Sequence, residues 1–594
     1  MYQKQQTTIM KNVIIFSLFS VFFILCIKTI HGYINVAKEY GSQESNTIQT
    51  WSCADKDRCE KSFTSERDKA ISLETCQMTC GNVPPLWPKP TQLEIIRKDA
   101  STFMKEHVFL TIHSPNDKVK GELEEAANTF INNLGGSNSY VLQDKERRVL
   151  KLNIHVREAD LTLRSTTDEE YALYSQKLDD TLLLVNIFAS NYYGARHGLE
   201  TLSQLIWYDH ITKRFRIIHD VKIIDKPAFR HRGLLIDVSR HFVPIKVLRK
   251  AVEGMAASKM NVLHLHLSDS SSFPLILPRN EDFAIKGSYN EESRYTPEDI
   301  KKLVEYARKR GVRTIMEIDA PSHVTPSAWP KEEILCNNPD MFKTTLNPDN
   351  PNALKTLESI YRDLLELGTD KETFHIGDDE VITSCWTNTD SARQLHNDVY
   401  KVWVNFTNAM LERVKLANNG TMPKNVVLWS SPLTDRYIHS LTHQEELVVQ
   451  YWFGQLKGIM ESNFKIIFST VGQWYLDCGF GPWKKSEANG ACDPYTNWRK
   501  FYKYRPWNEF PQRLDQVLGG EVCLWTEEVD AEDVETRLWP RTAAFAERVW
   551  SDPAEFDRSD VFRRIDFHSR RLRARGLRVA SIWPEVCSQY PERC

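Results

Sequence analysis

The chain has 594 residues, of which 41% are hydrophobic and 26% are charged, and its formal net charge is -3. This is the composition of a globular protein with material for two or more domains. No long basic run is present, which argues against a nucleic-acid partner, because binding to a phosphate backbone needs clustered Lys and Arg. The 16 Trp residues are compatible with a carbohydrate site, but tryptophan is equally good core material.

The N-terminus carries an apolar run from Val13 to Ile27. Such a run has the length of a signal-peptide core and is short for a membrane span. We expect residues 1–32 to be a signal peptide cleaved near Gly32. An uncleaved signal anchor is the alternative, because Lys28 lies close to the end of the apolar run. Either route takes the rest of the chain into the secretory pathway.

The cysteines indicate an oxidising compartment. Twelve cysteines less Cys26 in the leader leave eleven, and Cys523 is the odd one among them. The first four of the eleven fall within residues 33–83, which we interpret as a Cys-bearing extension held by disulfides. A zinc site is the alternative for these four, but no His-rich segment accompanies them. Two N-x-S/T sequons, at Asn405 and Asn419, also fit secretion.

A proline-rich stretch, residues 84–90 (PPLWPKP), marks a domain boundary. The pattern that follows predicts a compact α+β domain over residues 84–226. Residues 149–156 alternate as a strand does, residues 182–188 form a second apolar run, and residues 195–207 have helical spacing.

Residues 227–594 show a different pattern, in which short apolar runs recur with helical stretches between many of them. Eight such runs predict a (β/α)₈ barrel with enlarged loops, within an α/β fold class; a doubly wound open sheet is the alternative. The eight runs are Gly233–Val238, Val262–Leu267, Arg313–Ile318, Thr373–Gly377, Val426–Trp429, Leu447–Tyr451, Lys465–Phe468 and Val517–Leu524. The clearest intervening helices are expected over residues 247–258, 297–310 and 352–367.

The fourth run ends in three adjacent carboxylates, Asp378, Asp379 and Glu380. Adjacent carboxylates repel one another, so holding them together at the end of a buried strand is costly. Proteins accept that cost where a proton is given and a positive charge is stabilised, as in glycosidic bond cleavage. A solvated acidic turn is the alternative, but other strand ends favour the catalytic interpretation.

In a barrel, the strand ends gather on one face. The expected ends carry aromatic and charged side chains that suit a sugar ring, whose C–H faces stack on tryptophan and whose hydroxyls bind charged groups. These residues are Arg240, Asp269, His323, Trp429, Trp452, Tyr475, Asp477, Trp525 and Glu527. Each alone has a plainer interpretation as a core residue or a surface ion-pair partner.

Four separated stretches resemble the family-20 glycoside hydrolases, the β-N-acetylhexosaminidases. They are residues 229–237 (FRHRGLLID), 264–269 (HLHLSD), 375–380 (HIGDDE) and 519–527 (GGEVCLWTE). Residues 86–88 (LWP) and 198–205 (GLETLSQL) are similar to the non-catalytic N-terminal domain of that family. The resemblance spans Leu86 to the C-terminus, and the Cys-bearing extension is most similar to the arthropod branch.

The resemblance implies an exo-acting enzyme that removes terminal N-acetylglucosamine or N-acetylgalactosamine by a substrate-assisted retaining mechanism. The substrate's own 2-acetamido oxygen attacks the anomeric carbon, so no metal or cofactor is expected. Chitin oligomers, N-glycan ends and other glycoconjugates remain open as substrates. A cleaved leader would make the enzyme extracellular or lysosomal, whereas an anchor would hold it in the Golgi or plasma membrane. Family members are often dimers, which implies a homodimer.

The resemblance also implies a role for each site residue. Glu380 is expected to be the general acid and then the base, with a pKa raised by burial beside Asp379. Asp379 is expected to hold the acetamido N–H and stabilise the oxazolinium intermediate, and Tyr475 to donate to the acetamido oxygen. Trp429, Trp452 and Trp525 would enclose the acetyl group and the ring. Arg240 would bind the 3- and 4-hydroxyls, and Asp477 and Glu527 would bind the 4- and 6-hydroxyls. Asp269 and His323 would lie behind the residues that touch the substrate and tune Glu380.

Five disulfides are expected. The expected pairs are Cys53–Cys80, Cys59–Cys76, Cys336–Cys385, Cys478–Cys492 and Cys587–Cys594.

Two departures from the family pattern bear on function. The family usually has Gly where this chain has Asp378, and we expect this extra carboxylate to point away from the catalytic pair. Chitin-specialised arthropod enzymes carry Trp at the position of Ala491, and the loop of residues 336–347 is short, so these two features argue against a specific chitin-oligomer preference. A non-catalytic sugar-binding protein on the same scaffold is the alternative, against which the intact Asp379, Glu380 and Tyr475 argue.

Overall fold

The computed structural model describes residues 47–594 except 55–57, 82, 98, 136–147, 337–343, 369, 486–488, 491 and 591–592. The expected leader, residues 1–32, and Ala491 therefore lie outside the described residues. Within the described part, none of the helices combines the length and the apolar character that a bilayer crossing requires.

The Cys-bearing extension folds as a hairpin and a helix. Strands β1 (Ile48–Ala54) and β2 (Arg58–Thr64) pair antiparallel, and helix α2 (Leu73–Thr79) begins after Ser72, whose hydroxyl accepts the N–H of Thr75. Two disulfides, Cys53–Cys80 and Cys59–Cys76, join the hairpin to the helix. A unit this small has little core of its own, so these covalent links supply much of its stability.

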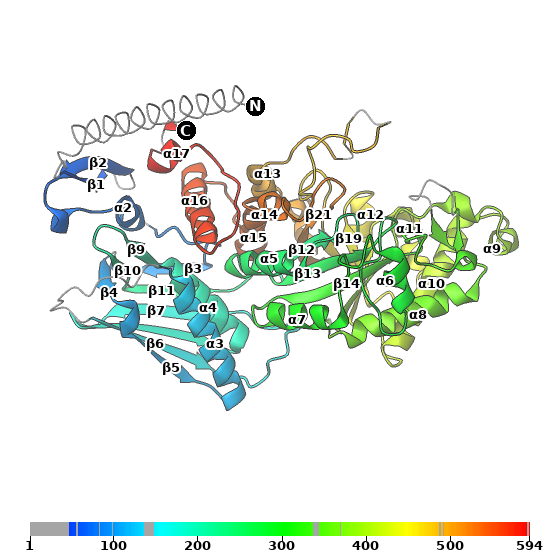
Figure 1. The fold of residues 1–594 in the computed structure, drawn as a ribbon, viewed down its shortest axis with the longest axis horizontal. Coiled ribbons are helices and arrows are strands. Elements are labelled where there is room, and N and C mark those ends of the chain that lie inside the picture. Colours follow the sequence, from blue (N-terminus) through cyan, green and yellow to red (C-terminus); the bar gives the residue numbers. More distant parts are fainter. Residues whose placement is uncertain are drawn as a thin grey trace, which may run out of the picture.

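The N-terminal domain is a six-stranded sheet in the order β3-β11-β7-β8-β6-β5, with helices α3 and α4 on one face (Figure 1). The expected strand over residues 149–156 is present as β6, and the second apolar run forms β8. The helix expected over residues 195–207 is wrong at both ends. Helix α4 begins at Tyr192, three residues earlier than expected, because Asn191 caps it there, and it ends at Gln204 because Ile206 already pairs in a second, three-stranded sheet. The elements are β3 (Gln92–Ile95), β4 (Ala100–Phe103), β5 (Val108–His113), α3 (Asp117–Asn133), β6 (Val149–Val156), β7 (Tyr171–Lys177), β8 (Leu182–Ala189), α4 (Tyr192–Gln204), β9 (Ile206–Asp209), β10 (Arg214–Ile218) and β11 (Val221–Asp225).

The rest of the chain builds a closed barrel of eight parallel strands, which confirms the predicted fold class. The strands are β12 (His231–Asp237), β13 (Val262–Ser268), β14 (Arg313–Ala320), β17 (Thr373–Gly377), β18 (Asn425–Trp429), β19 (Leu447–Tyr451), β20 (Lys465–Phe468) and β21 (Val517–Leu524). Their interiors are buried on both faces, which is why they read as continuous apolar runs in the sequence.

Helices surround the barrel, and those expected from the sequence differ from the observed ones by one or two residues at their ends. Helix α7 begins where expected, because Thr296 and Asp299 form a capping box before Pro297. The helices are α5 (Ile245–Ala257), α6 (Glu281–Gly287), α7 (Pro297–Arg308), α8 (Pro351–Glu366), α9 (Asp390–Gln394), α10 (Val399–Ala417), α11 (Pro432–Tyr437), α12 (Leu456–Glu461), α13 (Trp498–Lys503), α14 (Val534–Leu538), α15 (Arg541–Ser551), α16 (Arg558–Ala574) and α17 (Glu585–Gln589), and the short strands β15 (Ile334–Leu335) and β16 (Thr345–Leu346) pair in a loop.

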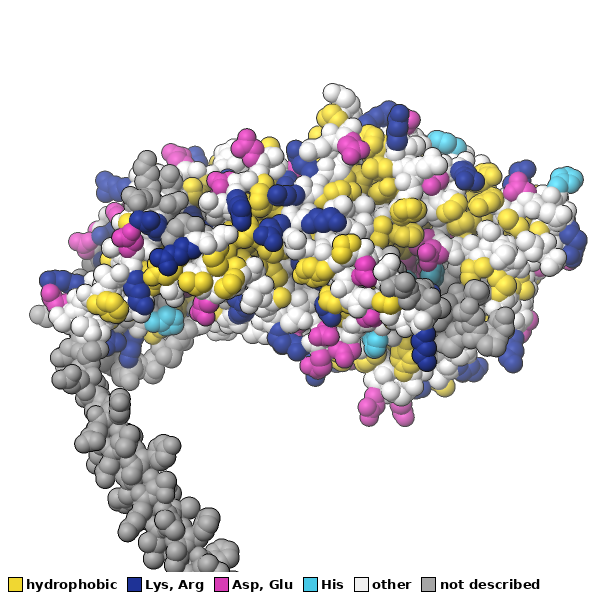
Figure 2. All heavy atoms as spheres, turned by 90° about the horizontal axis from the view of Figure 1, so that it is seen from above, with side chains coloured by type: hydrophobic (Ala, Val, Ile, Leu, Met, Phe, Trp, Pro, Cys, Tyr) yellow, Lys and Arg dark blue, Asp and Glu magenta, His cyan; other side chains and the backbone are white. Residues whose placement is uncertain are grey.

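The two domains meet at a buried polar interface that fixes the barrel against the N-terminal sheet. Lys259, which follows α5, binds Asp225 at 2.7 Å and the hydroxyl of Tyr171 at 2.8 Å, and Trp550 donates its indole N–H to the same aspartate at 3.0 Å. The Cys-bearing extension also contacts the C-terminal helix, because Gln77 of α2 donates to the carbonyl of Ser588 in α17 (Figure 1). Basic and acidic side chains are interspersed over the face shown in Figure 2.

Three further disulfides brace the barrel loops and the C-terminus. They are Cys336–Cys385, Cys478–Cys492 and Cys587–Cys594, and Cys523 on β21 is free and buried. The Cys478–Cys492 link closes the long loop after β20, which carries Tyr475 and Asp477.

Candidate active site

The closed barrel brings eight strand ends to one rim, and the candidate residues lie there. Asp379 and Glu380 follow β17 directly. The other candidates follow or end their own strands: Arg240 (β12), Asp269 (β13), His323 (β14), Trp429 (β18), Trp452 (β19), Tyr475 and Asp477 (β20), and Trp525 and Glu527 (β21).

The turn after β17 is strained. Gly377, Asp378 and Glu380 all have positive φ angles, of 73°, 71° and 44°. At Gly377 a side chain is excluded, since an added Cβ would lie 1.8 Å from Oδ1 of Asp319. Such left-handed conformations in non-glycine residues cost energy and collect at functional sites.

Asp378 points away from the catalytic pair and into the wall between β17 and α10. Its carboxyl accepts the indole N–H of Trp403 at 2.8 Å and the hydroxyl of Thr407 at 3.0 Å. Burial raises the pKa of Asp378 well above its usual value, which favours the uncharged form of the group. The third carboxylate of the motif is therefore a structural group outside the site.

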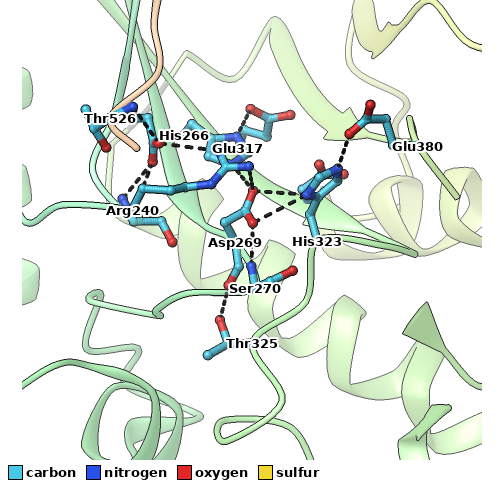
Figure 3. A network of polar contacts seen from close by, with 12 residues as sticks. Arg240, His266, Asp269, Ser270, Glu317, His323, Thr325, Glu380 and Thr526 are labelled. Atoms are coloured by element: carbon cyan, nitrogen blue, oxygen red, sulfur yellow. Dashed lines mark hydrogen bonds and ion pairs between the residues drawn. The ribbon is translucent and has the colours of Figure 1, made fainter. Parts of the chain in front are cut away.

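Glu380 lies at the end of a line of ion pairs that starts at Arg240 (Figure 3). Nε2 of His323 lies 3.2 Å from Oε2 of Glu380, and Nδ1 of the same ring lies 3.2 Å from Oδ2 of Asp269. The Arg240 guanidinium binds that aspartate oxygen at 2.7 Å. Cation, anion, cation and anion therefore alternate along the line.

This arrangement corrects one expectation from the sequence. Glu380 was expected to have a raised pKa, but the hydrogen bond from His323 holds its pKa below the usual value. Its side chain is 57% exposed, so burial is too weak to reverse that effect. Burial disfavours the charged imidazole, but Asp269 and Glu380 outweigh it and raise the pKa of His323 well above its usual value. In the unliganded site the proton therefore resides on His323.

The pKa of Asp379 is shifted in the opposite direction from that of Glu380. Burial and the neighbouring Glu380 raise its pKa to about 7, although His323 acts against them. Asp319, at the end of β14, also has a pKa raised by burial and by Asp379. Asp319 has no expected role from the sequence, although the spacing of Glu317 and Asp319 on one strand places both side chains on the same face.

An aromatic cluster stands beside these carboxylates. Its buried members include Trp429 and Tyr475, and Trp452 and Trp525 pack against them. The ring centroids of Trp525 lie 5.9 Å from Trp429 and 6.2 Å from Tyr475. The indole of Trp452 is fixed by a hydrogen bond to the carbonyl of Ser430 at 2.8 Å. The predicted aromatic residues therefore gather in one place.

The remaining polar candidates surround Trp525. The Arg240 guanidinium lies 5.3 Å from the Trp525 ring centroid and 3.8 Å from a carboxylate oxygen of Glu527. Oδ1 of Asp477 is buried and has no hydrogen-bond partner among the described residues. Burial, and next the charge of Glu527, raises the pKa of Asp477 to about 8. An orphaned buried oxygen of this kind suits a hydroxyl donor from a ligand.

Among the described residues, two groups that contain no disulfide-bonded cysteine have side chains of types that also bind metals. Asp319, His323 and Asp379 form one group, and His264, Glu317 and His375 form the other. Several of these atoms already bind one another or the backbone, as in the 3.1 Å pair of His264 with Glu317 and the 3.0 Å bond from the Gly377 N–H to His375. We therefore interpret both groups as ion-pair and hydrogen-bond networks.

Comparisons with known proteins assign this geometry to a family. Residues 229–553 match the catalytic domain of glycosyl hydrolase family 20. The chain belongs to this family. Residues 86–205 of the family-20 chain also match a domain described as beta-acetyl hexosaminidase like.

Relatives of the family-20 chain extend over almost all of its length. It is 34% identical to the "Probable beta-hexosaminidase fdl" of Drosophila melanogaster, over 92% of this chain and 91% of the relative. It is 32% identical to the "Chitooligosaccharidolytic beta-N-acetylglucosaminidase" of Bombyx mori, over 96% and 99% of the two chains. Among solved structures, the Flavobacterium johnsoniae chitobiase is 25% identical, with a TM-score of 0.64 over 83% of this chain and 73% of that one.

These findings establish the class of activity. The chain is a glycoside hydrolase, an exo-acting β-N-acetylhexosaminidase, which acts on sugars that end in N-acetylhexosamine. The non-catalytic alternative is not favoured.

Proposed function

We propose that the enzyme cleaves its substrate by a retaining mechanism in which the 2-acetamido group of the bound sugar is the nucleophile. The observation that carries the proposal is the Asp379–Glu380 pair beside the aromatic cluster of Trp429, Tyr475 and Trp525. Asp379 lies close enough to Tyr475 to contribute to its raised pKa, for which burial is the main cause. An acetamido group between them could accept from the phenol and donate its N–H to the carboxylate.

Glu380 is proposed to deliver the proton to the departing oxygen and then to activate water. In the unliganded site that proton lies on His323, 3.2 Å away. A bound sugar would remove water from Glu380, and desolvation favours its neutral form. The proton would then pass to Glu380 at the moment when the leaving group needs it.

Asp379 is proposed to hold the acetamido N–H and to stabilise the positive charge of the oxazolinium. Its pKa of about 7 in the unliganded site is lowered by any donor or cation that binds it, so the substrate itself would favour the anion. Preorganised charge of this kind is usually the largest contribution to catalysis.

The sugar hydroxyls are proposed to bind at the far side of Trp525. Arg240 would donate to the 3- and 4-hydroxyls, and the orphaned oxygen of Asp477 would accept from the 4- or 6-hydroxyl together with Glu527. Because Arg240 already binds Asp269, the residue that recognises the sugar also joins the ion pairs leading to the acid.

A chromogenic N-acetylglucosaminide tests the roles directly. Glu380→Gln should lower kcat by about 10² to 10⁴ while sugar binding persists. Replacing the substrate acetamide by its mono-, di- and trifluoro forms should lower kcat/KM progressively, because fluorine withdraws electrons from the attacking oxygen. A rate that is insensitive to fluorination, or a glycosyl ester trapped on Asp379, would contradict substrate assistance.

We propose that the enzyme tolerates a broad range of aglycones, so that its substrates include chitin fragments and the ends of N-glycans and other glycoconjugates. The relatives named above include a probable hexosaminidase and a chitooligosaccharide-degrading enzyme at similar identity. Comparing turnover of chitobiose with that of a biantennary N-glycan would separate a chitin specialist from a glycan-trimming enzyme.

The enzyme is proposed to work in or beyond the secretory pathway, as a glycosylated homodimer. Five disulfides and the exposed side chains of Asn405 and Asn419 support this compartment. N-terminal sequencing of the mature protein would distinguish a cleaved leader from an anchor. Sedimentation analysis before and after enzymatic deglycosylation would give both the glycan mass and the oligomeric state.

A further inference from the structure

The barrel interior below the active site contains a line of alternating imidazoles and carboxylates. Glu521 of β21 binds Nε2 of His231 at 2.8 Å and Nδ1 of His264 at 2.7 Å. Nε2 of His264 lies 3.1 Å from Glu317, which in turn binds Nδ1 of His266 at 2.7 Å. All five side chains are almost completely buried.

The line continues to the proposed acid. Nε2 of His266 lies 3.0 Å from Oδ2 of Asp269, the aspartate that binds His323 beside Glu380 (Figure 3). The buried interior and the exposed carboxyl of Glu380 are therefore connected through one unbroken series of ion pairs.

Glu317 is the branch point of this series. Its Oε2 binds His266 at 2.7 Å, whereas its Oε1 accepts the indole N–H of Trp429 at 2.7 Å. One buried carboxylate thus holds the wall of the proposed acetyl pocket with one oxygen and the line to Glu380 with the other.

Titratable groups face Glu317 from β13, β14 and β17. His264 and His266 face it from β13. His375 faces it from β17, but burial lowers the pKa of His375, and its Nδ1 already accepts the N–H of Gly377. Asp319 lies on the same strand, and Asp379 follows β17; both feel the charge of Glu317.

The charge states agree with this geometry. Although burial opposes the charged form, the carboxylates around His266 raise its pKa to about 10, and those around His264 raise its pKa to about 9. A buried imidazolium depends on its anionic partners, so a neutral group in place of Glu317 would lower the pKa of His266, with Asp269 remaining as its partner.

We propose that Glu317 is a positioning residue that sets both the proton affinity of the Glu380–His323 pair and the place of the Trp429 wall. The inference rests on the proposed roles of Glu380 and Trp429. Glu317 itself touches neither Glu380 nor any reacting atom; it acts through His266, Asp269 and His323 on one side and through Trp429 on the other.

The test compares Glu317→Gln with Glu169→Gln. Glu169 is a matched control, because it is also buried and binds both an arginine, Arg232 at 2.5 Å, and a histidine, His197 at 2.9 Å, but at the domain interface. Both substitutions remove a buried carboxylate and keep its shape, and both should lower the melting temperature.

Only Glu317→Gln should change catalysis. Loss of positive charge at His266 raises the pKa of Glu380, so the alkaline limb of kcat should move up by roughly half a pH unit to one unit. The inhibition constant of N-acetylglucosamine should rise several-fold, because Trp429 and His266 face different oxygens of Glu317, and glutamine replaces one of these acceptors by an NH2 donor. His266→Gln, which keeps the carboxylate and removes the cation, should shift the same limb in the same direction and serves if Glu317→Gln does not fold.

The outcomes separate the two proposals. If Glu380→Gln abolishes hydrolysis but Glu317→Gln and His266→Gln keep the wild-type pH profile and product affinity, the positioning role of Glu317 is wrong. If Glu380→Gln leaves hydrolysis intact, the proposed mechanism itself is wrong. Matching shifts in the Glu169→Gln control would show that the effect follows from lost stability alone, which would also overturn the inference.

Discussion

Nε2 of His323 lies 3.2 Å from Oε2 of Glu380, and this pair holds the proton that the proposed mechanism needs. The exposed Glu380 alone would be an ordinary carboxylate, ionised at neutral pH. The imidazolium keeps a proton within one hydrogen bond of it, and Asp269 keeps the imidazolium charged. We therefore expect the line from Asp269 to Glu380 to act as a unit.

If these residues act as a unit, their substitutions should not be additive. His323→Asn should lower kcat by roughly 10² or more, and Asp269→Asn by a comparable factor, because each separates Glu380 from its proton source. The double variant should lower kcat by about the same factor as the more damaging single variant. Steady-state kinetics on one substrate measures the three factors. Multiplication of the two single losses in the double variant would contradict a shared role.

The acid limb of kcat/KM should report Asp379. Its pKa is raised toward 7, so in the free enzyme it gains a proton, and loses the ability to stabilise the oxazolinium, as the pH falls through that region. We expect kcat/KM to decline well above pH 4, the ordinary range of an aspartate. Asp379→Asn should lower kcat/KM by about 10² to 10³ and remove that limb. A wild-type limb near pH 4 would contradict the assignment.

Much of the fold was predictable from the sequence because its barrel strands are short, apolar and separated by helices. Four of the eight runs, including Thr373–Gly377 and Lys465–Phe468, coincide with the observed strands. Periodicity failed where two signals overlapped: Ile206 and Trp207 continue the apolar spacing of α4 but pair in β9. The hairpin of the extension was not predicted, because its strands are largely polar and give no strand signal. Two disulfides stabilise it in place of an apolar core.

The site was less accessible to sequence reasoning than the fold. A motif such as HIGDDE gives the residue types at a strand end, but the pKa of Glu380 depends on His323, which lies 57 residues away in the chain. The role of Glu317 could not be found because Trp429 and His266 reach it from other strands. The expectation that Asp378 points away from the Asp379–Glu380 pair is confirmed, although its partners on α10 carry no signal in the motif.

The buried ion pairs of the barrel interior should make stability depend on alkaline pH. His264 and His266 have folded-state pKa values of about 9 and 10, above the ordinary value of 6.5. A raised pKa contributes stability that is complete below the unfolded value and is lost as the pH rises through the folded value. The free energy of unfolding should therefore fall between pH 6.5 and about pH 10.

Denaturant titrations at several pH values measure this decline, and Glu521→Gln provides the comparison. That variant removes an anion that binds His264, so it should be less stable by about 3 to 5 kcal/mol near neutral pH and should decline less steeply above it. Parallel curves for the two proteins would show that the histidines do not cause the decline.

Asp378 offers a test of whether the third carboxylate of the motif belongs to the site. Its raised pKa means that the folded state keeps a proton that the unfolded state releases above pH 3.8, so wild-type stability is lost as the pH rises from there. Asp378→Asn cannot ionise, keeps an acceptor for Trp403, and tolerates the positive φ. Its stability should match the wild type near pH 4 and exceed it increasingly toward pH 7.

Asp378→Ala leaves the indole N–H of Trp403 unpaired and should lower the free energy of unfolding by about 1 to 3 kcal/mol near pH 4. Both variants should retain kcat, since the side chain faces α10; a loss of more than about tenfold in Asp378→Asn, at about 1.4 kcal/mol per factor of ten, would place this carboxylate in the catalytic machinery.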